Sequence, residues 1–358
     1  MKIRARRVAS NQLQIPFGRL LIAVVVPAYN EAAVLAESLK SLSTVVSSDH
    51  IYVVSDGSTD QTARIAKASV PNVLALKKNR GKAGALKALI TKFRLTRRYD
   101  YIFFFDADTR ISREFLKRVR RMLVDEKPAL LVGTVGSGRN GLISAYRAYE
   151  YGFSHFFYKN AQNAMGTIVV APGCASVYRS DVIDALDFTN HTLTEDLDLT
   201  MQIHHRRLGR IVYCPQATVA TQDPATFSDY WKQINRWNTG FWQNFFLHKL
   251  YQPNRKINLE VLLLVADVGL WLVILALAAV HPLVILKLYG LSLLISTSLG
   301  VATVALTGQF WALPYAPLFG FFHLINLSSL IYSLFRATVR GRQPLSWQKV
   351  SRYALSQS

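Results

Sequence analysis

The sequence predicts an α/β domain built on a parallel sheet and followed by a group of apolar helices. Short β-branched runs alternate with helical periodicity over residues 20–105, residues 257–336 are almost continuously apolar, and acidic residues follow two predicted strands. Alternating strands and helices are typical of a parallel sheet, which binds ligands beyond the carboxyl ends of its strands. Asp56 and Asp106 therefore mark the expected site.

The first predicted strand covers residues 20–27 (LLIAVVVP), a β-branched run that ends at a proline. Beyond residue 127 the pattern is less regular, with strands expected at residues 130–134 and 167–170 and an aromatic-rich helix at residues 146–160. The remaining elements are strands expected at residues 50–55, 72–76 and 101–105 and helices expected at residues 32–42, 61–68 and 82–93.

Residues 227–250 are dense in aromatic and basic side chains. This composition favours a helix that lies in a membrane interface, and a helix packed on the α/β core is the alternative. Residues 259–280, 283–306 and 310–335 follow as apolar segments. Each is long enough to cross a hydrocarbon core, which needs about 20 residues.

Polar residues and the basic C-terminal tail limit how these segments are placed. Asp267 and Lys287 are costly in lipid and are expected to face protein or the interface, and Pro314 and Pro317 should kink or break the third segment. Residues 337–358 are basic, which predicts a cytoplasmic tail. Three full crossings would put this tail opposite to the α/β domain, so two and three passes both stay open.

The formal net charge is +20, from 42 Lys and Arg against 22 Asp and Glu. No zinc-finger spacing, helix-turn-helix pattern or RNA-recognition motif is present, so nucleic acid is not an expected partner. Anionic membrane lipids and a nucleotide diphosphate explain the charge better. The two cysteines, Cys174 and Cys214, have no metal-ligand spacing and form no disulfide framework, which indicates a reducing, cytoplasmic environment.

Asp106 and Asp108 follow the apolar strand predicted at residues 101–105. Two carboxylates one residue apart at a strand end can turn toward one hard cation. Mg²⁺ or Mn²⁺ would take such oxygen ligands and keep substrate phosphates in its shell. The alternative is a pair of capping or surface carboxylates.

Two glycine-containing turns lie at the same predicted edge. Asp56 begins the turn DGSTD, where it either caps the following helix or accepts a hydrogen bond from a nucleotide base. Residues 79–84 (NRGKAG) open a helix with glycines and cations, and backbone N–H groups there together with Lys82 suit a diphosphate. The glycine spacing fits neither a P-loop nor a dinucleotide-binding fingerprint.

Two further motifs carry candidate chemistry. Asp196 in the TED motif is a candidate general base for an acceptor hydroxyl, while an N-capping box over residues 192–195 is the alternative. Arg236 and Trp237 lie on one helix face with Gln233. Arg236 would stabilise a leaving diphosphate and Trp237 would stack on a sugar, although an interface tryptophan needs no such role.

Together these motifs resemble family-2 glycosyltransferases, most closely the processive membrane synthases of cellulose, chitin, hyaluronan and poly-N-acetylglucosamine. The resemblance covers roughly residues 20–250 and implies a GT-A fold, a Rossmann-like fold that binds a nucleotide sugar. Six motifs in the family's order carry it: PAYNE (27–31), SDGSTD (55–60), NxGKxG (79–84), DAD (106–108), TED (194–196) and QxxRW (233–237).

The resemblance also implies a role for each site residue. Asp196 would be the catalytic base, and Asp106 and Asp108 would hold the metal. Cys174 lies in a segment, residues 172–176, that aligns with a loop near the acceptor sugar, although a small buried thiol is an equal alternative. The implied donor-binding residues are Tyr29, Glu31, Asp56, Lys82, Asp106, Asp108 and Arg236, and the implied acceptor-binding residues are Cys174, Glu195, Gln233 and Trp237.

The expected organisation has five parts. A basic segment (1–19) precedes the GT-A catalytic domain (20–226), and amphipathic interface helices with QxxRW (227–256) lead to a transmembrane region of two to three passes (257–336) and a basic cytoplasmic tail (337–358). The expected location is the cell (inner or plasma) membrane, with several passes and a cytoplasmic catalytic domain.

The implied reaction is metal-dependent and inverting, from a UDP-sugar to a growing β-linked polysaccharide. The alternative is a single transfer to a lipid acceptor such as ceramide, diacylglycerol or polyprenyl phosphate. A third hypothesis is a non-enzymatic nucleotide-sugar-binding protein. Such synthases usually have membrane helices before the catalytic domain, and this sequence has none there. Its apolar segments are few for a polysaccharide channel, which would need a second copy of the chain or an export partner.

Overall fold

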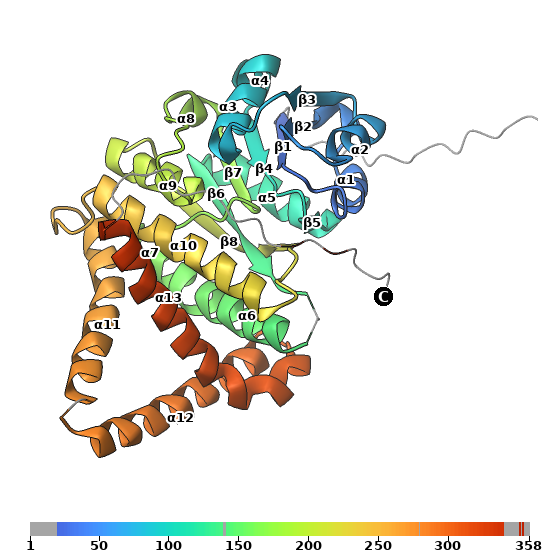
Figure 1. The fold of residues 1–358 in the computed structure, drawn as a ribbon. Helices are drawn as coiled ribbons and strands as arrows, with labels where there is room; N and C mark the ends of the chain where they lie inside the picture. The colour runs from blue at the N-terminus through green and yellow to red at the C-terminus, as the bar shows by residue number, and fades with distance from the viewer. Residues whose placement is uncertain (1–19, 139–140, 279, 340–350, 352, 354–358) are drawn as a thin grey trace, which may run out of the picture.

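The computed structural model describes residues 20–138, 141–278 and 280–339 together with Ser351 and Tyr353. Its centre is an eight-stranded sheet in the order β3-β2-β1-β4-β7-β6-β8-β5 (Figure 1). The strands are β1 (Ile22–Ala28), β2 (Ile51–Asp56), β3 (Asn72–Leu76), β4 (Tyr101–Phe104), β5 (Arg110–Ile111), β6 (Leu130–Gly136), β7 (Ser176–Arg179) and β8 (Ile211–Ala220).

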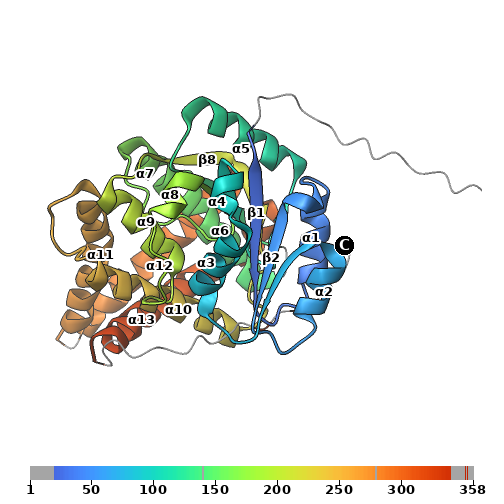
Figure 2. The same cartoon turned by 90° about the horizontal axis from the view of Figure 1, so that it is seen from above.

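Helices cover both faces of this sheet (Figure 2). They are α1 (Leu35–Ser43), η1 (Ser48–His50), α2 (Thr62–Ser69), α3 (Gly81–Phe93), α4 (Leu95–Arg98), α5 (Arg113–Glu126), α6 (Gly141–Phe153), the π-helical turn η2 (Ser154–Lys159), α7 (Asn160–Met165), α8 (Ser180–Asp184) and α9 (Glu195–Arg206). Successive strand residues point to opposite faces. Val24 and Val26 of β1 therefore pack with α1, α2 and α5, whereas Ala23 and Val25 pack with α3, α8 and α9.

The first half of the sheet is parallel, as the sequence predicts. β1 pairs in parallel with β2 and β4, and β2 pairs in parallel with β3. The parallel pattern, which was predicted from residues 20–105, ends at β4, because β7 runs antiparallel to both β4 and β6. A parallel neighbour requires a crossover helix over the sheet. Here α6, which lies between β6 and β7, packs against the C-terminal apolar helices instead.

Two predictions in this half have opposite outcomes. The helix predicted at residues 146–160 is confirmed, and it continues from α6 through η2 into α7. The strand predicted at residues 167–170 is wrong. Its backbone groups bond elsewhere, since Thr167 N donates to the Gln162 carbonyl at 2.8 Å and Val169 N to the Gln162 side chain at 3.4 Å. These bonds replace the strand ladder that the apolar composition suggested.

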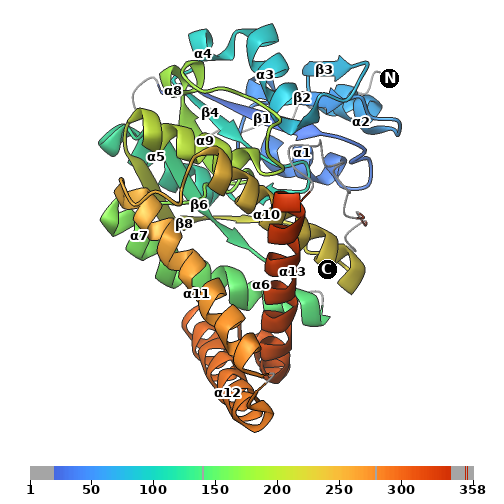
Figure 3. The same ribbon diagram turned by 60° about the vertical axis from the view of Figure 1, so that its left-hand side comes forward.

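The remaining helices are α10 (Phe227–Leu247), α11 (Lys256–Ala278), α12 (Pro282–Leu306), the 3₁₀ segment η3 (Phe310–Leu318) and α13 (Phe319–Val339). α11 leads away from the sheet, α12 lies at the far end, and α13 leads back (Figures 1 and 3). Pro314 and Pro317 lie in η3, which separates α12 from α13 and confirms the predicted break.

α10 lies between the α/β domain and α13. Tyr230, Asn235 and Trp242 are buried, whereas Phe227 and Phe246 are exposed. Most of α10 therefore packs against the protein, and its exposed residues are Phe227, Ser228, Trp231, Phe246 and Leu247.

Two stretches of described helix are long and apolar enough to cross a membrane, Leu286–Leu306 and Phe310–Thr338. Lys287 is exposed in the second turn of α12, so it does not face protein. Its long aliphatic side chain can extend toward the N-terminal end of α12 and place the ammonium group there. Nothing is described of the Asp267 side chain, and the N-terminal basic cluster and most of the basic tail lie outside the described residues. Tyr353 contacts the α/β domain, since its hydroxyl donates to the Asp223 carbonyl at 3.0 Å.

Candidate active site

A cavity of about 1170 Å³ opens at the carboxyl ends of β1, β2 and β4. Its walls come from the loops after these strands, from the loop before α9, and from the ends of α10 and α13. The cavity therefore lies where the sequence predicts the site, beyond the strand ends. Of the predicted site residues, those that line the cavity are Tyr29, Glu31, Asp56, Lys82, Asp106, Glu195 and Arg236.

The loops after β1 and β2 are joined by hydrogen bonds. Asn30 adopts a left-handed backbone conformation (φ 53°), which asparagine tolerates better than most residues. Its side-chain oxygen accepts from Thr59 N at 2.8 Å, and Glu31 N donates to Thr62 Oγ1 at 2.8 Å. These bonds fix Glu31 and the preceding Tyr29 at the rim of the cavity.

Asp56 is buried at the end of β2, and burial raises the pKa of its carboxyl. Its Oδ1 accepts from Arg80 N at 2.7 Å, which ties β2 to the loop before α3. The alternative in which Asp56 caps α2 is wrong. The bond to the start of α2 comes from Asp60, since Thr62 N donates to Asp60 Oδ1 at 2.9 Å.

Lys82 joins two of the predicted motifs. Its Nζ lies 2.7 Å from Asp106 Oδ1 and 2.8 Å from Glu195 Oε1. Burial alone would lower the pKa of Lys82, but the charges of Asp106, Glu195 and Asp196 raise it well above its usual range. A Cβ on Gly173 would lie 2.6 Å from this Nζ, so a larger residue there would displace the Lys82 ammonium group. The cavity thus contains a permanently charged cation at its centre.

Asp106 and Asp108 differ in their surroundings. The Asp106 side chain is 34% exposed and faces the cavity, whereas Asp108 is 7% exposed and accepts from Thr221 Oγ1 at 3.2 Å. Among the described residues, no three His, Cys, Asp or Glu side chains are grouped to hold a metal ion. Two carboxylates fit Mg²⁺ or Mn²⁺ if phosphate and water oxygens complete the shell, as is usual for Mg²⁺.

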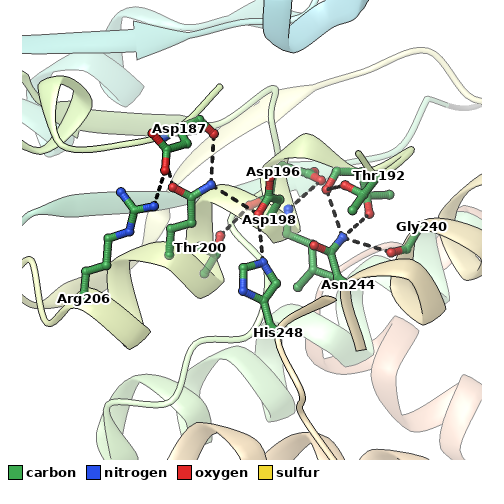
Figure 4. A network of polar contacts seen from close by, with 12 residues as sticks. Asp187, Thr192, Asp196, Asp198, Thr200, Arg206, Gly240, Asn244 and His248 are labelled. Carbon is green, nitrogen blue, oxygen red and sulfur yellow. Dashed lines mark hydrogen bonds and ion pairs between the residues drawn. The ribbon is translucent and has the colours of Figure 1, made fainter. Parts of the chain in front are cut away.

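Asp196 lies in the first turn of α9, where burial and the neighbouring Glu195 raise its pKa to about 6. Its Oδ1 accepts from Leu197 N at 2.9 Å, and its backbone carbonyl accepts from Thr200 Oγ1 at 2.6 Å (Figure 4). A carboxylate with a pKa near 6 is ionised at neutral pH and still basic enough to take a proton.

The loop before Asp196 is locked to α10. The N-cap residue of α9 is Thr194, whose side chain makes no capping bond, so the alternative of a capping box over residues 192–195 is wrong. The buried Asn244 on α10 donates instead to Thr194 Oγ1 at 3.1 Å (Figure 4). Gly240 lies one turn earlier, and a Cβ there would come within 2.4 Å of the same oxygen. This close contact fixes Asp196 relative to α10.

The QxxRW residues of α10 point to different surroundings. Arg236 lines the cavity, and its Nε is buried with no hydrogen-bond partner among the described residues. Gln233 and Trp237 contact Arg147 of α6 instead. Arg147 and Asn244 were both missed by sequence reasoning. The spacing Arg147-x-x-Glu150 at the start of a helical, aromatic-rich segment was the only available indication of the first.

Cys174 is buried in the core beside the sheet and is 7% exposed. Burial, with the charges of Asp106 and Asp108, raises the pKa of its thiol well above the usual range. The thiol is therefore protonated, and a small buried residue next to the carboxylates describes it well.

Residues 19–240 match the family model "Glycosyltransferase like family 2". The chain belongs to this glycosyltransferase family. A mannosyltransferase from Pyrobaculum calidifontis, solved with GDP-Man and Mn²⁺, superposes with a TM-score of 0.59 at 16% identity over 91% of this chain and 89% of its own. This likeness shows the predicted GT-A fold.

Relatives of this family 2 member differ in their products. The poly-β-1,6-N-acetyl-D-glucosamine synthase of Staphylococcus epidermidis is 26% identical over 66% of this chain and 62% of its own length. The β-monoglucosyldiacylglycerol synthase of Synechocystis is 25% identical over 63% of this chain and 48% of its own. The chain thus spans about half to two thirds of the length of the curated relatives it matches.

Proposed function

We propose that this glycosyltransferase moves a sugar from a UDP-sugar to a growing β-linked polysaccharide at the cytoplasmic face of a cell membrane. One observation carries the proposal. One cavity holds Asp56, the candidate contact for the nucleotide base, and Asp106, a candidate metal ligand. It also holds two cations for a diphosphate, Lys82 and Arg236. The poly-N-acetylglucosamine synthase among its relatives supports a polymeric product.

The proposed reaction is one displacement at the anomeric carbon, with inversion. The Asp196 carboxylate takes the proton of the acceptor hydroxyl as its oxygen bonds to that carbon, and the bond to the diphosphate breaks. Lys82 and Arg236 are fixed cations that offset charge on the leaving diphosphate. Asp106 and Asp108 are the residues that would hold Mg²⁺ or Mn²⁺. When bound, the metal supplies further positive charge beside the phosphates.

The membrane location rests on the C-terminal helices. Leu286–Leu306 and Phe310–Thr338 are the candidate spans. Because Ala337 and Thr338 line the cavity, the second span ends beside the catalytic residues. Two crossings agree with a tail on the catalytic side, and they remove the conflict that three crossings would create with its basic residues.

The test is transfer of radiolabelled sugar from UDP-glucose, UDP-N-acetylglucosamine and UDP-glucuronate by the full chain in lipid nanodiscs. Asp196→Asn should abolish transfer and leave Mn²⁺-dependent UDP binding, measured by calorimetry, within about twofold of wild type. Asp184→Asn, at an exposed position of α8, is the matched control and should transfer normally. Undiminished transfer by Asp196→Asn would exclude this residue as the base.

A single transfer to a lipid acceptor is the second candidate. The β-monoglucosyldiacylglycerol synthase among its relatives supports it, as does an apolar cleft of about 400 Å³ between α10 and α13 that is lined by Trp231 and Phe321. Product size separates the two functions. A polysaccharide remains at the origin in organic-solvent chromatography, whereas one glycolipid migrates.

A further inference from the structure

Arg147 of α6 is fully buried between two aromatic rings of α10. Its guanidinium carbon lies 4.7 Å from the ring centroids of both Tyr230 and Trp237. These rings are two helical turns apart on one face of α10, and Gln233 lies between them. Arg147 Nη2 donates to Gln233 Oε1 at 2.5 Å. Arg147 is therefore enclosed by Tyr230, Gln233 and Trp237, and the last two belong to the QxxRW motif.

The charge of Arg147 is balanced by a polar network that reaches α13. Its Nη1 pairs with Glu150 one turn along α6. Asn326 of α13 donates to Glu150 Oε1 at 3.0 Å and accepts from the Tyr230 hydroxyl at 2.7 Å. A buried cation is tolerated when it is paired and hydrogen-bonded in this way. The network thus fixes α6, α10 and α13 at one point.

This geometry determines which way the Gln233 amide faces. A guanidinium has only donors, so Gln233 must turn its Oε1 toward Arg147. Its –NH₂ group then points away from Arg147, and it has no hydrogen bond within the described part of the chain. In this orientation the –NH₂ group is the end of the Gln233 amide that remains available to a ligand, and it is a donor.

We propose that Arg147 is a positioning residue that presents the Gln233 amide as a hydrogen-bond donor to an oxygen of the acceptor sugar. The inference rests on the proposed function, taken with the acceptor-binding role that the family resemblance implies for Gln233 and Trp237. It adds that Gln233 is the hydrogen-bond donor in this contact, and that Arg147 sets this orientation of the amide. Arg147 also covers one face of the Trp237 indole, so the sugar would stack on the opposite face.

Lysine cannot replace Arg147 in this role. The planar guanidinium donates to Gln233 and Glu150 at once and stacks between two rings, whereas an ammonium is a compact and strongly hydrated point charge. Arg147→Lys therefore keeps the charge but releases the amide. Because removing a buried ion-pair partner can also unfold a protein, the decisive variant leaves Arg147 in place.

The decisive variant is Gln233→Glu, which keeps the size of the side chain and can still pair with Arg147 but cannot donate. Gln216→Glu, at an exposed position of β8, is the matched control. In nanodiscs, each protein is tested for melting temperature, Mn²⁺-dependent UDP binding, and transfer and hydrolysis of the UDP-sugar that wild type consumes.

Gln233→Glu should melt like wild type, bind UDP normally and still hydrolyse the donor, while transfer falls about 10-fold or more through a raised acceptor KM, the effect of one lost hydrogen bond. Arg147→Lys should show the same loss of transfer relative to hydrolysis. A folded Gln233→Glu protein that transfers at the wild-type rate overturns the inference. If wild type neither binds UDP nor transfers sugar, the proposed function itself is wrong.

Discussion

Gly240→Ala should impair catalysis far more than stability. The new Cβ would lie 2.4 Å from Thr194 Oγ1 and 2.9 Å from Thr194 Cβ, whereas ordinary contacts begin at 3.4 Å. α10 cannot retreat, since α13 packs along its other side. The loop that carries Thr194 must therefore shift by about 1 Å, and Asp196 is only two residues further on.

The two effects differ in size. Overpacking costs about 1–3 kcal/mol, and replacing a helical glycine returns about 1 kcal/mol, so the free energy of unfolding should fall by about 0–2 kcal/mol. Misplacing a catalytic group by about 1 Å costs about 100-fold in rate. The Gly240→Ala enzyme should therefore melt within several degrees of wild type and lose about 99% of its transfer activity.

Gly290→Ala is the matched control, because no heavy atom lies within 4 Å of a Cβ at this helical position. Both variants are assayed in nanodiscs for sugar transfer, UDP binding and melting temperature. The control should retain wild-type activity. If Gly240→Ala transfers within about threefold of wild type while it melts normally, the contact with Thr194 does not position Asp196.

Three other predictions follow from the site. Lys82→Met should weaken Mn²⁺-dependent UDP binding about 10-fold or more in calorimetry, because two carboxylates lose their shared cation. Transfer should rise as the pH rises through about 6, because Asp196 ionises. The raised pKa of Asp196 stabilises the folded state at low pH, and this stability is lost as the pH rises from about 4 to 6. Asp196→Asn should remove this pH dependence of the melting temperature. Ser329→Leu should destabilise the chain by about 1–3 kcal/mol, since Ser329 is buried against Asn235 at 2.6 Å, whereas Ser328→Leu at the exposed neighbour should not.

The first half of the fold follows from local sequence. The run at residues 20–27 and the strands predicted after it have enough β-branched residues between glycine-rich turns to be recognised individually. Parallel strand–helix alternation then predicts their carboxyl ends at one edge. Tyr29, Asp56, Lys82 and Asp106 converge there because each follows its own strand or opens the next helix. Little long-range information is needed for this convergence.

The second half depends on contacts between distant segments. The apolar residues 167–170 look like a strand, but Gln162 takes their backbone donors. β7 is only four residues long and is defined by its antiparallel partners, β4 and β6. A pattern of alternating hydrophobicity cannot show which partner supplies the hydrogen bonds. The antiparallel part of the sheet was missed for this reason.

The polar residues of α13 are a signal in the sequence for a contact between helices. Asn326, Ser329 and Ser333 recur on one face of an apolar helix, and such residues are expected where helices meet rather than where they face lipid. In the structure Ser329 accepts from Asn238 at 2.9 Å, and Asn326 bonds Tyr230. The apolar character of this segment suggested only an anchor.

α13 also contacts the candidate active site. It packs along α10 through a seam of small polar side chains, where Trp242 Nε1 donates to the Leu330 carbonyl at 3.0 Å. Asn326 of α13 donates to Glu150, the ion-pair partner of Arg147. Ala337 and Thr338, in the last turn of α13, line the cavity. Any change in the tilt of α13 would therefore act on both predicted subsites, because α10 carries both Arg236 and Gln233.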